Sequence, residues 1–210
     1  YDSSGVALIE PTGIVVEKKQ GKLANLEKIL AGRNFQSTIG LGHIRWATHG
    51  APSDQNAHPH ADCHNEIFVV QNGIIENANT LKKELIKKGH IFKSETDTEI
   101  LAHLIESYLD HNPLEEAVTK ALREVIGTYG LAVISAREPQ KIVAARLGSP
   151  LVLGIINGNE YIITSDVAAL LTHTRQVVYL EDHEIITIAN GQYAISTLDR
   201  QKVAHPCEEI

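Results

Sequence analysis

Short apolar runs separated by turn residues dominate the second half of this chain. From Thr128 onward they recur at the spacing of β-hairpins, and Asn157-Gly158 between two of them is a strong two-residue turn signal. Hairpins join antiparallel strands, so the pattern predicts antiparallel sheets rather than parallel crossovers. The strands predicted in this half are Tyr129–Ser135, Lys141–Arg146, Pro150–Ile156, Glu160–Thr164, Gln176–Tyr179, Glu184–Ile188 and Tyr193–Ser196.

The first half of the chain adds helical stripes to short strands. Between Leu23 and Leu30 the apolar positions recur every three to four residues, as on one face of an amphipathic helix. Ser94–Glu99 is rich in side chains that cap a helix N-terminus. The predicted helices are Leu23–Leu30, Ala78–Lys88, Thr98–Leu109, Leu114–Val125 and, in the second half, Asp166–Leu171; the predicted strands are Val6–Ile9, Ile14–Glu17, Ser37–Leu41 and Glu66–Gln71. Helices and antiparallel strands together indicate the α+β class.

Length and composition fit a single domain over residues 1–210. With 43% hydrophobic and 21% charged residues the chain can bury its own core, and no linker divides it. A net charge of −7 without a basic run argues against nucleic acid as a partner. No apolar run or signal-peptide pattern indicates a membrane. Two cysteines make no disulfide framework, so we expect a cytoplasmic protein.

The stretch Gly42–Gly50 gathers a guanidinium, the only Trp of the chain, a hydroxyl and two imidazoles. Arg45 presents a planar fork of donors that fits a carboxylate, and Trp46 offers a rigid apolar wall. The stretch fits a packed surface hairpin and the rim of a pocket for a small anionic or zwitterionic molecule equally well.

Histidines and a cysteine crowd this stretch and the region that follows it. They are His43, His49, His58, His60, Cys63 and His64. Their spacing matches no paired zinc pattern, so we interpret them as hydrogen-bonded loop residues and predict no metal site. Cys63 and His64 are neighbours whose side chains point in opposite directions on an extended backbone, which disfavours a nucleophile–base pair.

Two further positions allow a structural and a functional interpretation. Asn72-Gly73 follows a buried strand, and the pair is typical of a hairpin turn. An Asn amide and a Gly N–H at one spot would also suit a developing oxyanion. Asp97 is most simply a helix cap, although a carboxylate there could hold a ligand ammonium.

Together these stretches resemble a known family. Gly42–Gly50, Asn56–His60, Gln71–Asn77 and Ser94–Glu99 stand in the order seen in class II glutamine amidotransferases of the N-terminal nucleophile type. Tyr1–Gly5 and Arg146–Gly154 resemble further motifs of the aminosugar branch, the glutaminase domain of glucosamine-6-phosphate synthases. The resemblance covers nearly the whole chain and implies a four-layer αββα sandwich of two antiparallel sheets between helices.

The resemblance also implies roles for individual residues. The side chain matching Arg45 binds the α-carboxylate of L-glutamine, and the one matching Asp97 binds its α-ammonium. Trp46, Thr48 and His49 match residues that shape the pocket. No cofactor is implied. The implied partner is a sugar-phosphate isomerase domain of the same protein, with a homodimer possible through that longer chain.

The implied reaction is attack of a thiol on the glutamine side-chain amide, with Asn72 and Gly73 matching the oxyanion hole. In the family the thiol belongs to an N-terminal Cys whose own α-amine is the base. Tyr1–Gly5 resembles a downstream motif, so we expect the leading strand and helix with this Cys to be absent from these 210 residues. Neither Cys63 nor Cys207 substitutes for it, and we expect the chain as given to be inactive. The alternative is a catalytically dead domain that binds glutamine or acts as a scaffold.

Overall fold

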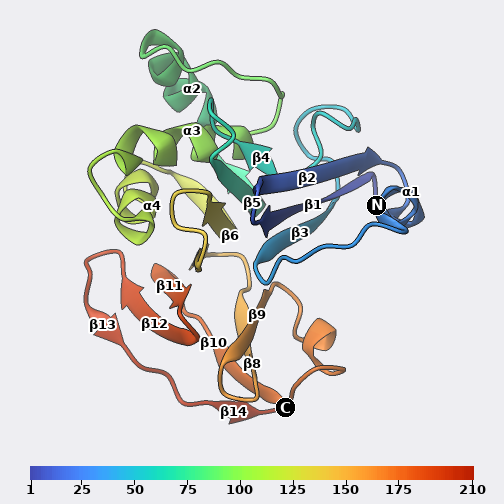
Figure 1. Ribbon diagram of the computed structural model, residues 1–210. Helices are drawn as coiled ribbons and strands as arrows, with labels where there is room; N and C mark the ends of the chain where they lie inside the picture. Colours follow the sequence, from blue (N-terminus) through green and yellow to red (C-terminus); the bar gives the residue numbers. More distant parts are fainter.

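A seven-stranded antiparallel sheet forms the centre of the computed structural model, which describes residues 1–210 (Figure 1). Its strand order is β13-β12-β11-β7-β6-β5-β4. The strands are β4 (His60–Ala61), β5 (Ile67–Ile75), β6 (Gly127–Ser135), β7 (Lys141–Leu147), β11 (Glu184–Ala189), β12 (Gln192–Thr197) and β13 (Lys202–Val203). Strands β5 and β6, nine residues each, are the longest and lie next to each other.

Two smaller antiparallel sheets form a second layer. One has the order β2-β1-β3 and the other β14-β10-β8-β9. Their strands are β1 (Ser3–Glu10), β2 (Gly13–Gln20), β3 (Gly40–Arg45), β8 (Val152–Ile156), β9 (Glu160–Thr164), β10 (Gln176–Tyr179) and β14 (Glu208–Glu209). The predicted α+β class and antiparallel pairing are confirmed, and the second layer is divided into two hydrogen-bonded sheets.

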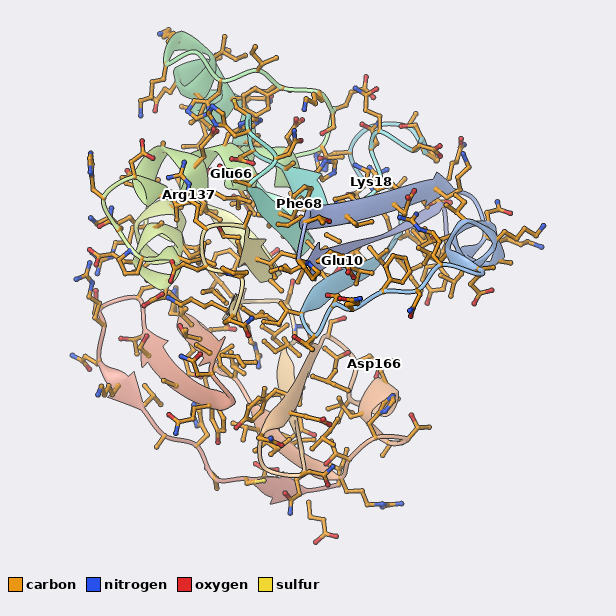
Figure 2. All side chains as sticks on the ribbon, viewed as in Figure 1. Glu10, Lys18, Glu66, Phe68, Arg137 and Asp166 are labelled. Carbon is orange, nitrogen blue, oxygen red and sulfur yellow. The ribbon has the colours of Figure 1, made fainter.

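Three helices cover one face of the central sheet. α3 (Thr98–Leu109) and α4 (Leu114–Leu122) pack on the face that carries Ile67 and Val69, and α2 (Ala78–Lys87) packs against α3. Successive side chains of a strand point to opposite faces, so Phe68 and Val70 lie in a different cluster, against β1 and β3 (Figure 2). Strand β5 is therefore buried on both faces, which explains its continuous apolar run.

The remaining helical segments are short. α1 (Leu23–Leu30) lies beside β1 and β2, and the 3-10 turn η1 (Val167–Leu170) packs on the outer face of the four-stranded sheet through Leu170. The predicted helices begin where the structure has them, except that the turn η1 starts one residue later. None of the helices has the length and apolar character needed to cross a bilayer.

Two predicted boundaries differ in ways that matter for the site. The predicted strand Ser37–Leu41 is in fact β3, which runs from Gly40 to Arg45 and so includes the start of the Gly42–Gly50 stretch. Asn72-Gly73 is not a hairpin turn, because β5 continues through it to Ile75. Pairing with β6 holds this segment extended and overrides the local turn preference.

Candidate functional site

A cavity of about 160 Å³ lies where β3 ends, along one edge of β5 and below the loop that leads into α3. Six of the seven site residues predicted from the sequence line it: Arg45, Trp46, Thr48, Asn72, Gly73 and Asp97. The volume is well below that of pockets for drug-sized ligands, and suits a molecule of amino-acid size.

The cavity exists because strand β4 stops early. It has two residues and pairs only with the start of β5, so the N–H groups further along that edge face no strand. The N–H of Gln71 donates to His58 Nδ1 at 3.4 Å, and that of Ile75 donates to Asp97 Oδ2 at 2.9 Å. Strand alternation points the N–H of Gly73, midway between them, to the same edge and into the cavity.

Gly73 occupies a position that no other residue type fits. Its φ is +119°, and a Cβ there would lie 2.2 Å from the carbonyl oxygen of Thr128 on β6. The glycine therefore lets β5 bend its backbone toward the cavity while it stays paired with β6.

The amide of Asn72 is oriented by a histidine. His43 Nε2 lies 2.9 Å from Asn72 Oδ1 and donates to it, which leaves the amide nitrogen of Asn72 free as a donor. With the N–H of Gly73, this places two donors side by side on the cavity wall.

Stacked imidazoles back this wall. The rings of His43 and His58 are stacked with centroids 4.3 Å apart, and His60 meets His58 edge-on at 4.9 Å. Burial lowers the pKa of His43, lowers that of His58 well below its usual value, and lowers that of His60 to about 3. The three rings are therefore neutral near pH 7.

Arg45 supplies a buried positive charge. The side chain is 4% exposed and donates to the backbone carbonyls of His49 and Gly50. Its Nη1 is buried without any hydrogen-bond partner, a costly arrangement unless a ligand accepts from it. Burial lowers the pKa of Arg45, while the nearby carboxylates of Asp2 and Asp97 raise it.

The structure places His49 outside the cavity lining. Its side chain is exposed, and its contribution is the carbonyl that accepts from Arg45. Trp46 and Thr48 line the cavity from the solvent side, with Trp46 76% exposed. The rim is therefore the accessible part of the site, and the β5 edge is its buried floor.

Asp97 does not cap α3 as the simplest interpretation expects. Its side chain accepts no bond from the helix and instead accepts from Ile75. The loop around it is fixed on both sides, because Thr96 Oγ1 lies 3.0 Å from His60 Nε2 and Thr98 Oγ1 donates to Gln71 Oε1 at 2.7 Å. These contacts hold a carboxylate over the same cavity as Arg45.

Sequence reasoning missed the residues that support the site. His43, His58 and Gln71 orient the donors of β5, and they carry no recognisable spacing of their own. The alternation along β5 was the available signal, since it places every second N–H on the open edge. Neither Cys63 nor Cys207 lines the cavity.

Sequence comparison shows which family the chain belongs to. Residues 16–204 match the model of a glutamine amidotransferase domain. Glutamine–fructose-6-phosphate aminotransferase (isomerizing) of Methanothermobacter thermautotrophicus is 47% identical over the whole chain, and that of Symbiobacterium thermophilum is 48% identical over 97% of it. The chain spans about a third of the length of these curated relatives, 35% and 33% respectively.

Solved structures share the fold at low sequence identity. Glutamine phosphoribosylpyrophosphate amidotransferase from B. subtilis superposes with a TM-score of 0.79 and 23% identity, covering 96% of this chain and 44% of that one. A glutamine aminotransferase class-II domain protein from Silicibacter pomeroyi gives 0.63 and 19%, covering 93% and 91%. These likenesses support the α+β architecture with its sheets packed between helices.

Proposed function

Because the chain belongs to the glutamine amidotransferase domain family, we propose that it is the glutamine-hydrolysing part of a glutamine–fructose-6-phosphate aminotransferase. In this role it releases ammonia from L-glutamine. A sugar-phosphate isomerase part of the same protein uses the ammonia to convert fructose-6-phosphate to glucosamine-6-phosphate. The relatives that carry this name, together with the third of their length that the chain spans, support the assignment.

One observation carries the substrate assignment: a buried cation and a buried anion line the same small cavity. Arg45 has an unpartnered Nη1 with which to bind an α-carboxylate. Asp97 uses one oxygen for Ile75 N–H and has the other for an α-ammonium. An amino acid presents these two charges on a single carbon, so the pair binds its backbone and leaves the side chain to reach the donors of β5.

Asn72 and Gly73 then act on the side-chain amide. A thiolate attacks the amide carbon, and the carbonyl oxygen becomes an oxyanion that the Asn72 amide nitrogen and the Gly73 N–H stabilise. The carbon–nitrogen bond breaks, and the nitrogen leaves as ammonia with a proton from the attacking group's base. Water hydrolyses the resulting thioester to glutamate and restores the thiol.

The thiol in this scheme is not one of the two in the 210 residues. Cys63 lies in a turn outside the cavity and Cys207 is exposed near the last strand. We therefore propose that the 210-residue chain binds glutamine without hydrolysing it, and that an N-terminal Cys, as the family resemblance implies, supplies the nucleophile.

Two preparations test this function. The first is the 210-residue chain, and the second is the same chain extended at its N-terminus to the Cys of the family pattern. Only the second is expected to release glutamate from glutamine, and changing its first Cys to Ala should abolish release. Equal release from both preparations would place the nucleophile within the 210 residues.

A glutamine-binding domain without activity is the competing function. It predicts no glutamate release from the extended chain, although the extended chain still binds glutamine in calorimetry. Loss of binding in Asp97→Asn is expected under both functions, so the kinetic measurement decides between them.

A further inference from the structure

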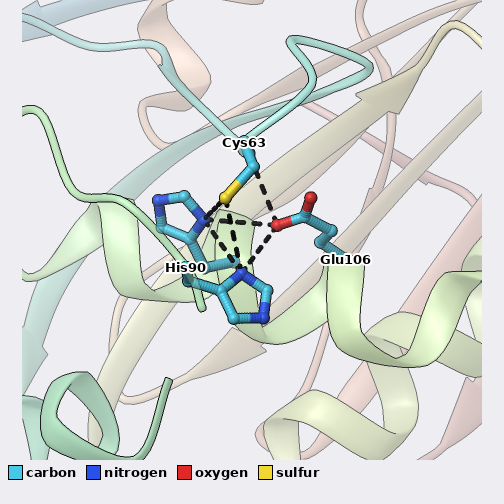
Figure 3. A group of neighbouring side chains, drawn as sticks. Cys63, His90 and Glu106 are labelled. Carbon is cyan, nitrogen blue, oxygen red and sulfur yellow. Dashed lines mark hydrogen bonds and ion pairs between the residues drawn. The ribbon is translucent and has the colours of Figure 1, made fainter. Parts of the chain in front are cut away.

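Four metal-binding side chains converge outside the cavity lining. Cys63 lies in the turn between β4 and β5, and His90 lies in the loop after α2. His103 and Glu106 are one turn apart on α3, so both project from the same helix face. Figure 3 shows the thiol, an imidazole and the carboxylate meeting at one point.

The donor atoms of Cys63, His90 and His103 are spaced much as in a tetrahedral metal site. Zn²⁺ binds sulfur at about 2.3 Å and nitrogen at about 2.0–2.1 Å, which at tetrahedral angles separates the donors by roughly 3.3–3.6 Å. Cys63 Sγ lies 3.4 Å from His103 Nδ1 and 3.7 Å from His90 Nδ1. The two Nδ1 atoms are 3.4 Å apart, and Glu106 Oε2 lies 2.8 Å and 3.3 Å from them.

Ordinary hydrogen bonding accounts for the 2.8 Å contact between His90 Nδ1 and Glu106 Oε2 but explains the contacts among the other donor atoms poorly. Three of the four groups are two imidazoles and a thiol. Their Nδ1 and Sγ atoms all face one another, so they cannot be sorted into separate donor–acceptor pairs. Two imidazole nitrogens at 3.4 Å, both also facing Cys63, are what a shared cation requires. The site is also well enclosed, with His103 1% exposed and His90 and Glu106 12% and 13% exposed.

A second set of contacts orients the donors. The far nitrogen of His103, Nε2, is buried without a hydrogen bond and faces Glu99 Oε1 at 3.6 Å. Glu99 is itself fixed by the N–H groups of Lys93 at 2.7 Å and Ser94 at 2.6 Å. A carboxylate behind the second nitrogen of a histidine is the usual arrangement around zinc ligands.

We propose that Cys63, His90, His103 and Glu106 form a structural Zn²⁺ site. Four protein ligands close the coordination sphere, which distinguishes a structural site from a catalytic one with an open position. The metal would tie the β4–β5 turn and the α2–α3 loop to α3. Asp97 stands at the start of that helix, so the site would also stiffen one wall of the glutamine cavity.

Metal analysis of the purified protein is the first test. After dialysis against Zn²⁺ and removal of free metal, about one zinc per chain is expected. Replacing zinc with Co²⁺ should give the intense visible bands of tetrahedral cobalt and a thiolate-to-cobalt charge-transfer band. A stoichiometry near zero, or an octahedral cobalt spectrum without the charge-transfer band, would overturn the proposal.

Matched variants locate the site. Cys63→Ser should remove the charge-transfer band and weaken Zn²⁺ binding by about 100-fold or more, whereas Cys207→Ser should leave both unchanged. His103→Gln should likewise lose the site, with exposed His173→Gln as its control. Equal effects of Cys63→Ser and Cys207→Ser would show adventitious binding.

A measurement on the unaltered chain avoids variants that fail to fold. Thiol-reactive reagent should modify only Cys207 while zinc is bound, and both cysteines after chelation. If Cys63 reacts at the same rate with and without chelator, its thiolate does not coordinate the metal.

Discussion

The carboxylate of Asp97 accepts a hydrogen bond from the backbone N–H of Ile75 at 2.9 Å, across twenty-two positions of sequence. This contact joins the loop before α3 to the end of β5 and so closes the cavity on one side. It uses Oδ2 only, and no donor of the chain contacts the second oxygen.

Asp97→Asn should weaken glutamine use mainly through KM. The amide can still accept from Ile75 but carries no charge, and removing one partner of a buried ion pair costs about 3–5 kcal/mol. We expect kcat/KM of the hydrolytically active, extended chain to fall by about 100-fold or more, with kcat reduced far less. Steady-state glutaminase kinetics measure both. Glu95→Gln, an exposed carboxylate of the same loop, is the control, and an unchanged KM in Asp97→Asn would contradict ammonium binding.

Asn72→Ala should lower kcat rather than raise KM. In the proposed reaction the free amide nitrogen contacts charge that develops only in the transition state, and loss of one oxyanion donor costs about 10²–10³-fold in kcat. Single-turnover kinetics of the extended chain separate this step from product release. Asn159→Ala, at the β8–β9 turn, should behave like the wild type. A rise in KM at constant kcat would make Asn72 a ground-state contact.

Gly73→Ala should destabilise the fold more than an alanine at another glycine of similar φ. Positive φ alone costs about 1–3 kcal/mol, and at Gly73 the new Cβ also meets the Thr128 carbonyl at 2.2 Å. Gly13 has a φ of +127° and open space around its Cβ position, so Gly13→Ala measures the cost of positive φ alone. Urea unfolding of Gly73→Ala and Gly13→Ala measures the difference. Equal losses would mean that β6 shifts freely to admit the methyl group.

Stability should rise with pH between about 8 and 10.5 because of Lys18. Lys18 lies on β2 (Figure 2), and its Nζ donates to the carbonyls of Gln55 at 3.1 Å and Pro59 at 3.2 Å. Burial lowers its pKa from 10.5 to about 8, although Glu99 acts in the opposite direction. In this window the unfolded chain binds a proton that the folded chain does not, so raising the pH favours folding.

Lys18→Met should remove that part of the pH dependence. The measurement is the free energy of unfolding at pH 7 and pH 10 for the variant and the wild type. Lys19→Gln, on the opposite face of β2, should keep the wild-type rise. The same rise in Lys18→Met would assign the effect to another group.

Much of the fold follows from local pattern. Helix α3 and strands β9 and β10 have the bounds predicted from the sequence, because periodicity and flanking turn residues coincide there. Asn72-Gly73 shows where local reasoning ends. Its turn preference is strong in isolation, but nine consecutive pairs with β6 keep it extended. Such pairing is a property of the assembled sheet.

The site shows the same division. Arg45 and Asp97 could be proposed from their chemistry and the family resemblance, since each carries its charge wherever the chain folds. Arg45 contacts the carbonyl of His49, and Asp97 contacts the N–H of Ile75. Both contacts depend on how β3 and the loop before α3 pack in the folded protein. The cluster of Cys63, His90, His103 and Glu106 also escaped prediction, because its members come from a turn, a loop and a helix.

The neutral imidazoles of His43, His58 and His60 bear on product release. In the proposed reaction, an imidazolium behind Asn72 and Gly73 would attract the second carboxylate that hydrolysis creates on glutamate. Because burial keeps these rings uncharged, the floor of the cavity offers dipoles to an amide but no countercharge to an acid. Under the proposed function, this uncharged wall therefore binds the product glutamate weakly.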